Sequence, residues 1–198
     1  MAGPLELERE ARAHLEASAK LASTLADGDL PSLVARAGTL IADALRGGGT
    51  VLFCGNGGSA ADAQHLAAEL VGRLDSSSDR DPLAGIALTT DTSILTAVAN
   101  DFGYEEVFAR QVRALGREGD ALVCLSTSGG SESVVRAARD ASALGIGVVA
   151  LVGPAASPLD DTADVSLHLP GETSGQIQQG HIAVGHALCA LAESALSA

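Results

Sequence analysis

Two short segments rich in glycine and serine have the composition of an anion-binding loop. One is GNGGS at 55–59 and the other is STSGGS at 126–131. The second lies between an apolar run and a helical stretch that begins near Glu132, so its hydroxyl groups and the unpaired N–H groups of the helix start could hold a phosphate without a lysine. An ordinary strand-to-helix turn with a serine cap has the same pattern. Neither segment matches a Walker A or GxGxxG motif, which argues against a nucleotide ligand.

A histidine, a glutamate and an arginine recur at intervals of four residues after the first of these segments. Because of this spacing, His65, Glu69 and Arg73 share one face of a helix and can act on one small volume. An imidazole and a carboxylate together can ligate a divalent metal or exchange protons with a substrate. A solvated stripe on a surface helix has the same spacing, so the pattern alone leaves both interpretations open.

The C-terminal segment offers three more polar side chains, Gln178, His181 and His186. His186 stands in the apolar run 182–188, which predicts that it is buried. A buried histidine can be a core residue with one satisfied hydrogen bond, or it can belong to a site.

Hydrophobic periodicity predicts the elements that must position these residues. Apolar residues at helical spacing predict helices over 5–26, 32–44 and 175–196. Short continuous apolar runs predict strands that are buried on both faces. These strands are 50–54, 84–88, 121–125, 147–152 and 164–169. We expect turn residues and a helix after each of the first four strands.

Two helices followed by alternating strands and helices are typical of an α/β domain. We expect a single domain of 198 residues with a doubly wound, mainly parallel five-stranded sheet flanked by helices, and with an N-terminal helical pair. Such sheets bind ligands beyond the carboxyl ends of their strands. Both glycine- and serine-rich segments follow strands, so both are expected at that edge of the sheet.

Composition limits the core and the partners. The chain has three Phe, one Tyr and no Trp among 46% hydrophobic residues, so its core must be built from Ala, Val, Leu and Ile. The formal net charge is −13 and the single lysine is Lys20, so the chain lacks the clustered cations that nucleic acids and anionic membrane surfaces require. No apolar run approaches the ~18 residues of a membrane helix. The polar stretch 75–81 is expected to be a surface loop.

The three cysteines, Cys54, Cys124 and Cys189, are far apart in the sequence, and each stands in an apolar run. An odd number of such residues is typical of buried free thiols in a reducing compartment. We therefore expect a cytoplasmic protein without disulfides.

Taken together, four segments resemble the sugar isomerase (SIS) domain family. They are CGNGGSAADAQHLAAELVGR at 54–73, ALTTDTSILTAVANDFGYEEVFARQV at 87–112, LSTSGGS at 125–131 and IQQGHIAVGH at 177–186. Two pairs, His65 with Glu69 and Gln178 with His186, are similar to its isomerase branch. The resemblance implies the SIS fold and an intramolecular oxidoreductase that converts D-sedoheptulose 7-phosphate to D-glycero-D-manno-heptose 7-phosphate through an enediol. That reaction is the first step of nucleotide-activated heptose biosynthesis.

The resemblance also implies an assembly and a site. It implies a homotetramer with sites at subunit interfaces, in which the helices of 1–48 serve oligomer packing and 49–198 form the α/β core. The implied metal is one Zn²⁺ per subunit, held by His65, Glu69, Gln178 and His186. The implied substrate-binding residues are Asn56, Gly57, Gly58, Ser59, Glu69, Arg73, Asn100, Asp101, Ser126, Thr127, Ser128, Ser131 and Gln178.

In the implied reaction, Glu69 shuttles the carbon proton and His186 handles an oxygen proton, while zinc polarises the carbonyl. Gln178 and His186 are eight residues apart, about 12 Å of axial rise on one helix. Meeting at one metal therefore requires an irregular helix start or two different subunits.

Three positions depart from the family pattern. Gln176 and Gln179 replace the usual Arg and Glu, and Gly130 replaces a frequent Asn. The main alternative function is a non-catalytic SIS protein that binds a partner such as a replication initiator. That branch lacks the residues matching Glu69 and His186. A sugar-phosphate sensor attached to a DNA-binding module is a third possibility, which the short and acidic chain disfavours.

Overall fold

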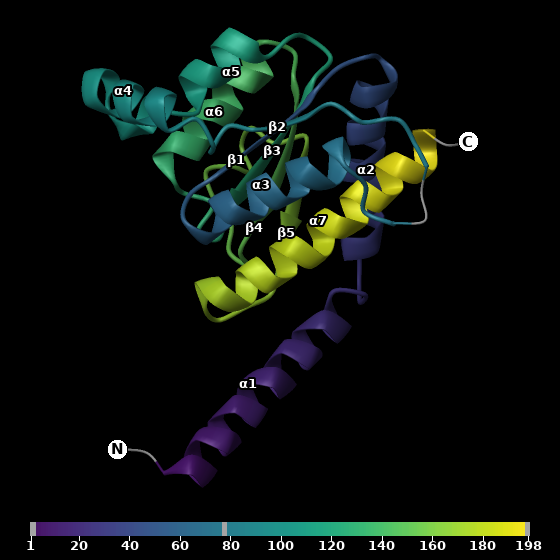
Figure 1. Cartoon of the computed structure of the whole chain (residues 1–198), viewed down its shortest axis with the longest axis vertical. Coiled ribbons are helices and arrows are strands. Elements are labelled where there is room, and N and C mark those ends of the chain that lie inside the picture. Colours follow the sequence, from purple (N-terminus) through teal and green to yellow (C-terminus); the bar gives the residue numbers. More distant parts are fainter. Residues whose placement is uncertain (1–2, 77–78, 197–198) are drawn as a thin grey trace.

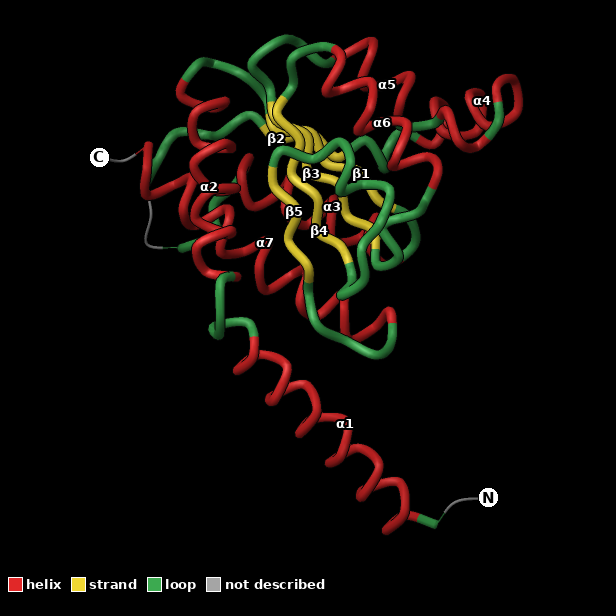
Figure 2. The backbone as a smooth tube through the Cα atoms, turned by 180° about the vertical axis from the view of Figure 1, so that it is seen from behind, coloured by secondary structure: helices red, strands yellow, loops and turns green. Residues whose placement is uncertain are grey.

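The protein, described by a computed structural model over residues 3–76 and 79–196, is built on a parallel sheet with the strand order β2-β1-β3-β4-β5. The strands are β1 (Val51–Gly55), β2 (Gly85–Ala87), β3 (Ala121–Ser126), β4 (Gly147–Val152) and β5 (Val165–His168). Figure 2 shows them as a twisted layer enclosed by helices. All five predicted strands are present, and no strand end differs from the prediction by more than one residue.

Helices cover both faces of this sheet, as expected for a doubly wound domain. One face carries α2 (Leu30–Arg46), α3 (Gly58–Val71) and α7 (Ser174–Leu196), which form a core with alternate strand residues. The other carries α5 (Ala109–Leu115) and α6 (Glu132–Ala143). The cores consist largely of Ala, Val, Leu and Ile, and every residue of β3 is buried. The predicted small-residue core is therefore confirmed.

The chain reverses its direction of travel across the sheet between β1 and β3. From β1 it crosses to β2 on one side, and it then returns to β3 on the other side. Ligand crevices of open α/β sheets lie at such a switch point, outside the carboxyl ends of the strands. The segments 55–59 and 126–131 follow these two strands, so both lie at this point.

Two connections differ from the prediction of one helix after each strand. The segment after β2 is divided into α4 (Thr92–Phe102), the short 3₁₀ helix η1 (Tyr104–Glu106) and α5, with a break at Gly103, whose φ is +93°. No helix follows β4, so the expectation for that connection is wrong. Pro154 and Pro158 lie in this connection, and proline lacks the N–H group that a helix interior needs.

The first helix, α1 (Pro4–Thr24), projects from the body of the molecule (Figure 1). It has no buried residue, and Leu5, Leu7 and Leu15 are exposed. By contrast, α2 packs on α7 and contributes Val34 and Ile41 to the core. In the described residues, no helix combines the length and the hydropathy that a membrane crossing requires.

One close helix contact sets the position of the residues discussed next. A Cβ atom on Gly185 of α7 would lie 2.6 Å from the Leu66 side chain of α3. Real Cβ atoms do not approach other atoms so closely, so a larger residue at 185 would displace the Leu66 side chain, and glycine permits the close approach of α3 and α7. This approach brings the neighbouring residues His186 and His65 together.

Candidate active site

Three ligand-type side chains converge between α3 and α7. His65 Nε2 lies 2.8 Å from His186 Nε2 and 3.2 Å from Glu69 Oε1. One ligand atom from each of the three residues lies within 4.8 Å of the others. Two imidazole nitrogens and a carboxylate oxygen are a typical ligand set for Zn²⁺, so the donor chemistry at this point fits that ion. The helical stripe of the sequence is therefore more than a solvated face at His65 and Glu69.

The two histidines of α7 lie in different environments. His186 is only partly buried, so the prediction that it is buried is wrong. His181 is fully buried, and neither of its ring nitrogens has a hydrogen-bond partner among the described residues. Burial lowers the pKa of His181 to about 4, although the Val152 backbone acts in the opposite direction. His181 is therefore the neutral core histidine, and His186 is the residue that faces α3.

Gln178 lies apart from the other predicted metal ligands on the same helix. Because α7 is a continuous helix from Ser174, an irregular start does not bring Gln178 towards His186. The Gln178 amide instead lies against the first residue of α3, where a Cβ on Gly58 would be 2.6 Å from Nε2. Within one chain, therefore, Gln178 does not join His65, Glu69 and His186 at one point.

The loop between β3 and α6 presents hydroxyl groups that its own helix does not use. Ser131 occupies the N-cap position of α6, but its side chain makes no cap hydrogen bond, so the serine-cap interpretation is wrong. Ser126 Oγ is buried and has no hydrogen-bond partner among the described residues. Thr127 Oγ1 lies 3.5 Å from Ser174 Oγ, and Ser128 Oγ accepts the Gly130 N–H at 3.2 Å. Unused donors at a helix N-terminus are suited to an anion such as phosphate.

The connection between β4 and β5 packs against this loop at Gly129. Gly129 has a φ of +62°, and a Cβ there would lie 2.2 Å from the Ser157 side chain. The Ser157 N–H donates to Asp160 Oδ2 at 2.7 Å, and His168 Nε2 lies 3.0 Å from Asp160 Oδ1. No local pattern predicts these contacts, because the residues that make them come from separate parts of the chain.

The remaining predicted substrate residues lie on three elements. Asn56 and Gly57 precede α3, and the φ of Gly57 is +58°. Asn100 and Asp101 lie exposed at the end of α4, where Asn100 Nδ2 donates to Asp101 Oδ1 at 2.7 Å. Arg73 is exposed just beyond the end of α3. Ser59, in contrast, is buried in the first turn of α3.

Comparison with known proteins gives a consistent family. The SIS domain family model matches residues 14–153. The phosphoheptose isomerase of Rhodospirillum rubrum is 50% identical over 190 residues, which cover 96% of this chain and 99% of the relative. The chain belongs to the phosphoheptose isomerase family of SIS domain proteins.

Solved structures of this family have the same fold. The phosphoheptose isomerase of Neisseria gonorrhoeae superimposes with a TM-score of 0.86 at 41% identity, over 95% of this chain and 99% of that one. That of Francisella tularensis gives a TM-score of 0.88 at 35% identity, over 94% of this chain and 97% of that one. Membership in the phosphoheptose isomerase family makes this chain an isomerase, and it disfavours the non-catalytic alternative.

Two residues near the phosphoheptose isomerase site were not predicted. Arg80 lies in the stretch expected to be a surface loop, yet its side chain is 8% exposed and its Nη2 is 2.6 Å from Glu193 Oε1. The same nitrogen donates to the backbone oxygen of Glu69 at 2.8 Å. Asp62 lies one turn before His65, and burial raises its pKa against the opposing effect of His65. Spacing on α3 could have indicated Asp62, whereas nothing in the sequence pointed to Arg80.

The positions that depart from the family pattern are also accommodated. Gln176 Oε1 accepts the Glu172 N–H at 2.8 Å, so it closes the turn before α7. Gln179 Oε1 is buried and has no hydrogen-bond partner among the described residues. At Gly130, a Cβ would be no closer than 3.9 Å to another atom, so nothing in the backbone requires glycine there.

Proposed function

We propose that this chain interconverts D-sedoheptulose 7-phosphate and D-glycero-D-manno-heptose 7-phosphate, an aldose/ketose isomerisation, as the first step of nucleotide-activated heptose biosynthesis. The observation that carries the proposal is the convergence of His65, Glu69 and His186 between α3 and α7. The loop 126–131, with its unused hydroxyl groups at the start of α6, adds to it. Relatives named phosphoheptose isomerases, with up to 99% of their length covered, support it.

The arrangement suits a sugar with a phosphate at one end and a reacting carbonyl at the other. The loop 126–131 supplies hydroxyl groups and N–H groups at the start of α6, beside the start of α7. His65 lies seven residues beyond Gly58, about 10 Å along α3. The phosphate and the reacting carbons would therefore bind at separate ends of the site.

The reaction moves a proton between C1 and C2. From the ketose, the Glu69 carboxylate would take a C1 proton to give an enediol and return it at C2. His186 would move the hydroxyl proton between the two oxygens. His65, Glu69 and His186, with Gln178 of a second copy, would hold Zn²⁺, which supplies polarisation of the carbonyl. The Asn56 amide, with Asn100 and Asp101, would bind sugar hydroxyl groups.

A homotetramer in the cytoplasm is part of this proposal. The apolar side chains on α1 are exposed in a single chain, which supports burial against other copies. Gln178 and His186 are eight residues apart on one continuous helix, which supports a metal site that takes Gln178 from a second copy. The three free cysteines, all buried, suit a reducing compartment.

A direct assay tests the catalytic roles. The protein is incubated with D-sedoheptulose 7-phosphate, and formation of the aldoheptose phosphate is followed. Because Glu69 and His186 move protons, Glu69→Gln and His186→Ala are each expected to lower kcat by about 10²–10⁴-fold. The exposed residues Glu118 and His14 give the matched controls Glu118→Gln and His14→Ala, which should retain full activity. Absence of turnover by the wild type, or full turnover by both site variants, contradicts the proposal.

A further inference from the structure

The Asn56 amide is held from two sides. The Tyr104 hydroxyl donates to Asn56 Oδ1 at 2.8 Å, and Asn56 Nδ2 donates to Ser133 Oγ at 3.0 Å. Tyr104 belongs to η1 and Ser133 to the first turn of α6, so three separate elements meet at this one amide. Rotation of the amide would break both hydrogen bonds.

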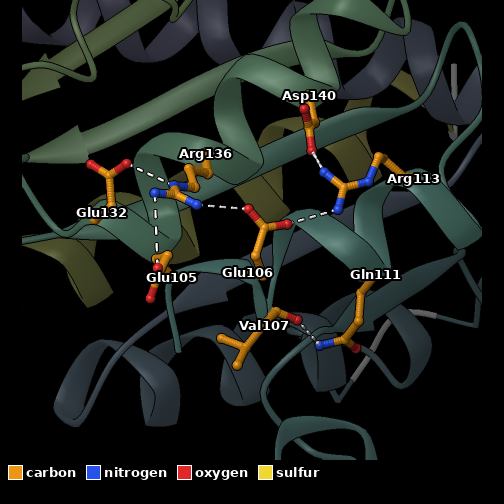
Figure 3. Close-up of polar contacts among 8 residues, drawn as sticks. All are labelled: Glu105, Glu106, Val107, Gln111, Arg113, Glu132, Arg136 and Asp140. Carbon is orange, nitrogen blue, oxygen red and sulfur yellow. Dashed lines mark hydrogen bonds and ion pairs between the residues drawn. The ribbon is translucent and has the colours of Figure 1, made fainter. Parts of the chain in front are cut away.

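The short helix η1 is itself fixed to its neighbours by Glu106, two residues beyond Tyr104. Glu106 Oε2 lies 2.8 Å from Arg113 of α5, and Glu106 Oε1 lies 2.8 Å from Arg136 of α6 (Figure 3). Arg136 also binds Glu132 at 2.8 Å, and Arg113 also pairs with Asp140. Hydrogen bonds from Arg113, and then from Arg136, lower the pKa of Glu106, so this carboxylate is charged at neutral pH. The position of Tyr104 is therefore set relative to α6, the helix that follows the loop 126–131.

Two bonding positions on the amide are left for a ligand. A primary amide has two N–H donors and two acceptor lone pairs, of which Tyr104 and Ser133 occupy one each. Among the described residues no hydrogen bond uses the other N–H or the other lone pair, and a hydroxyl group can satisfy both because it donates and accepts.

We propose that Tyr104 is a positioning residue for substrate binding: its hydroxyl fixes the Asn56 amide so that the free N–H and lone pair bind a hydroxyl group of the phosphosugar. This inference rests on the proposed function, since it assigns Asn56 to the sugar site. Glu106 is the anchor that holds Tyr104 in place. The effect belongs to binding and not to proton transfer, so it concerns KM more than kcat.

The decisive experiment is a kinetic double-mutant cycle. Tyr104→Phe removes one hydroxyl group and retains the ring, and it is expected to raise KM for D-sedoheptulose 7-phosphate about 3- to 10-fold with a smaller change in kcat. In an Asn56→Ala background the same substitution is expected to have no further effect, because Tyr104 acts through Asn56. Ser142→Ala, at an exposed serine of α6, is the control and should not change KM.

The cycle separates this inference from a purely structural role and from the proposed function. An unchanged KM in Tyr104→Phe, or an equal loss in both backgrounds, overturns the positioning role while wild-type turnover still supports the isomerase. If the wild type does not turn the substrate over, the proposed function fails instead.

A spectroscopic measurement tests the hydrogen bond without turnover. Tyr104 is the only tyrosine of a chain that has no tryptophan, so tyrosine emission reports on this one side chain. Asn56→Ala should change the emission of the free protein, because the hydroxyl loses its acceptor. Identical emission from Asn56→Ala and wild type overturns the bond on which the inference depends.

Discussion

His65 and His186 illustrate how much chemistry depends on two side chains that are remote in sequence. Their Nε2 atoms lie 2.8 Å apart, and Glu69 is within reach of His65. Such a group binds a divalent cation tightly only if the imidazoles are neutral and the carboxylate is ionised. A bound metal would explain why three ligand-type groups point at one spot near the surface.

We expect that the purified protein contains Zn²⁺ and that chelation lowers its activity, with recovery when zinc is added back. His65→Ala should lose the metal, since it removes the ligand that contacts both of the others. Elemental analysis of the wild type and the variant measures this directly, with His14→Ala as the control. Full activity in a preparation shown to be free of metal would remove zinc from the mechanism.

His181 makes stability depend on pH. Its folded-state pKa is lowered to about 4, whereas an unfolded histidine titrates near 6.5. Below pH 6.5 the unfolded chain therefore binds a proton that the folded chain does not, so folding stability falls as the pH drops from about 6.5 to about 4. The expected loss over this window is about 3 kcal/mol.

Urea denaturation at pH 7, 6 and 5 measures this effect. His181→Leu should flatten the pH dependence, because it removes the group that titrates in the unfolded state. His14→Leu, at an exposed histidine of α1, should retain the wild-type slope. Equal slopes for wild type and His181→Leu would show that other groups govern the acid sensitivity.

At the scale of elements, the contact between α3 and α7 determines the geometry of the site. Two features maintain this contact. The absence of a side chain at Gly185 lets Leu66 of α3 pack closely against α7. Further along the two helices, Arg80 binds both the backbone oxygen of Glu69 and the side chain of Glu193 in α7. The ion pair of Arg80 is almost fully buried, which makes the loss of either partner costly.

Gly185→Ala is expected to destabilise the fold by about 1–3 kcal/mol, because the new methyl group would overlap Leu66. It should also lower metal occupancy, since it moves His186 away from His65. Gly175→Ala is the matched control in the same helix, where a Cβ meets nothing closer than 4.0 Å. Thermal denaturation and elemental analysis of the two variants make the comparison, and equal behaviour would show that the helices can separate without loss.

At the scale of the whole molecule, the projecting helix α1 lacks the buried residues that the other long helices have. A helix with no buried residue gains little from packing, which supplies most of the stability of helices in proteins. Its exposed leucines suggest that partners in an oligomer supply the missing contacts. The net charge of −13 is compatible with association through α1, because the side chains that would be buried are the apolar leucines of that helix.

If the proposed tetramer forms through α1, the double variant Leu7→Glu/Leu15→Glu should dissociate it into smaller species. Light scattering coupled to gel filtration measures the change against multiples of the 19.7 kDa chain. Arg9→Gln, on the opposite side of α1, changes the charge by the same amount per site and should leave the assembly intact. A wild-type monomer, or an unaffected double variant, would contradict the proposed packing.

The sequence by itself determined the strands, most of the helices and the loops that end the strands. Hydrophobic periodicity is a local property, and buried parallel strands are continuous apolar runs whatever surrounds them. It also determined that His65 and Glu69 share a face, because that spacing is fixed within one helix. The helix expected after β4 does not form, because Pro154 and Pro158 lie in this connection and proline lacks the N–H group that a helix interior needs.

The tertiary structure decided which histidine of α7 faces α3, a choice that periodicity left open and that only the family resemblance indicated. His181 and His186 are five residues apart and point in different directions on the helix, and both stand among apolar neighbours. Packing of α7 on the sheet buries the first, and the close approach at Gly185 turns the second towards α3. The hydrogen-bond partners of Asn56 and the burial of Arg80 were likewise decided by the tertiary structure. A contact between two elements depends on how they pack, and the periodicity within one element contains no information about that packing.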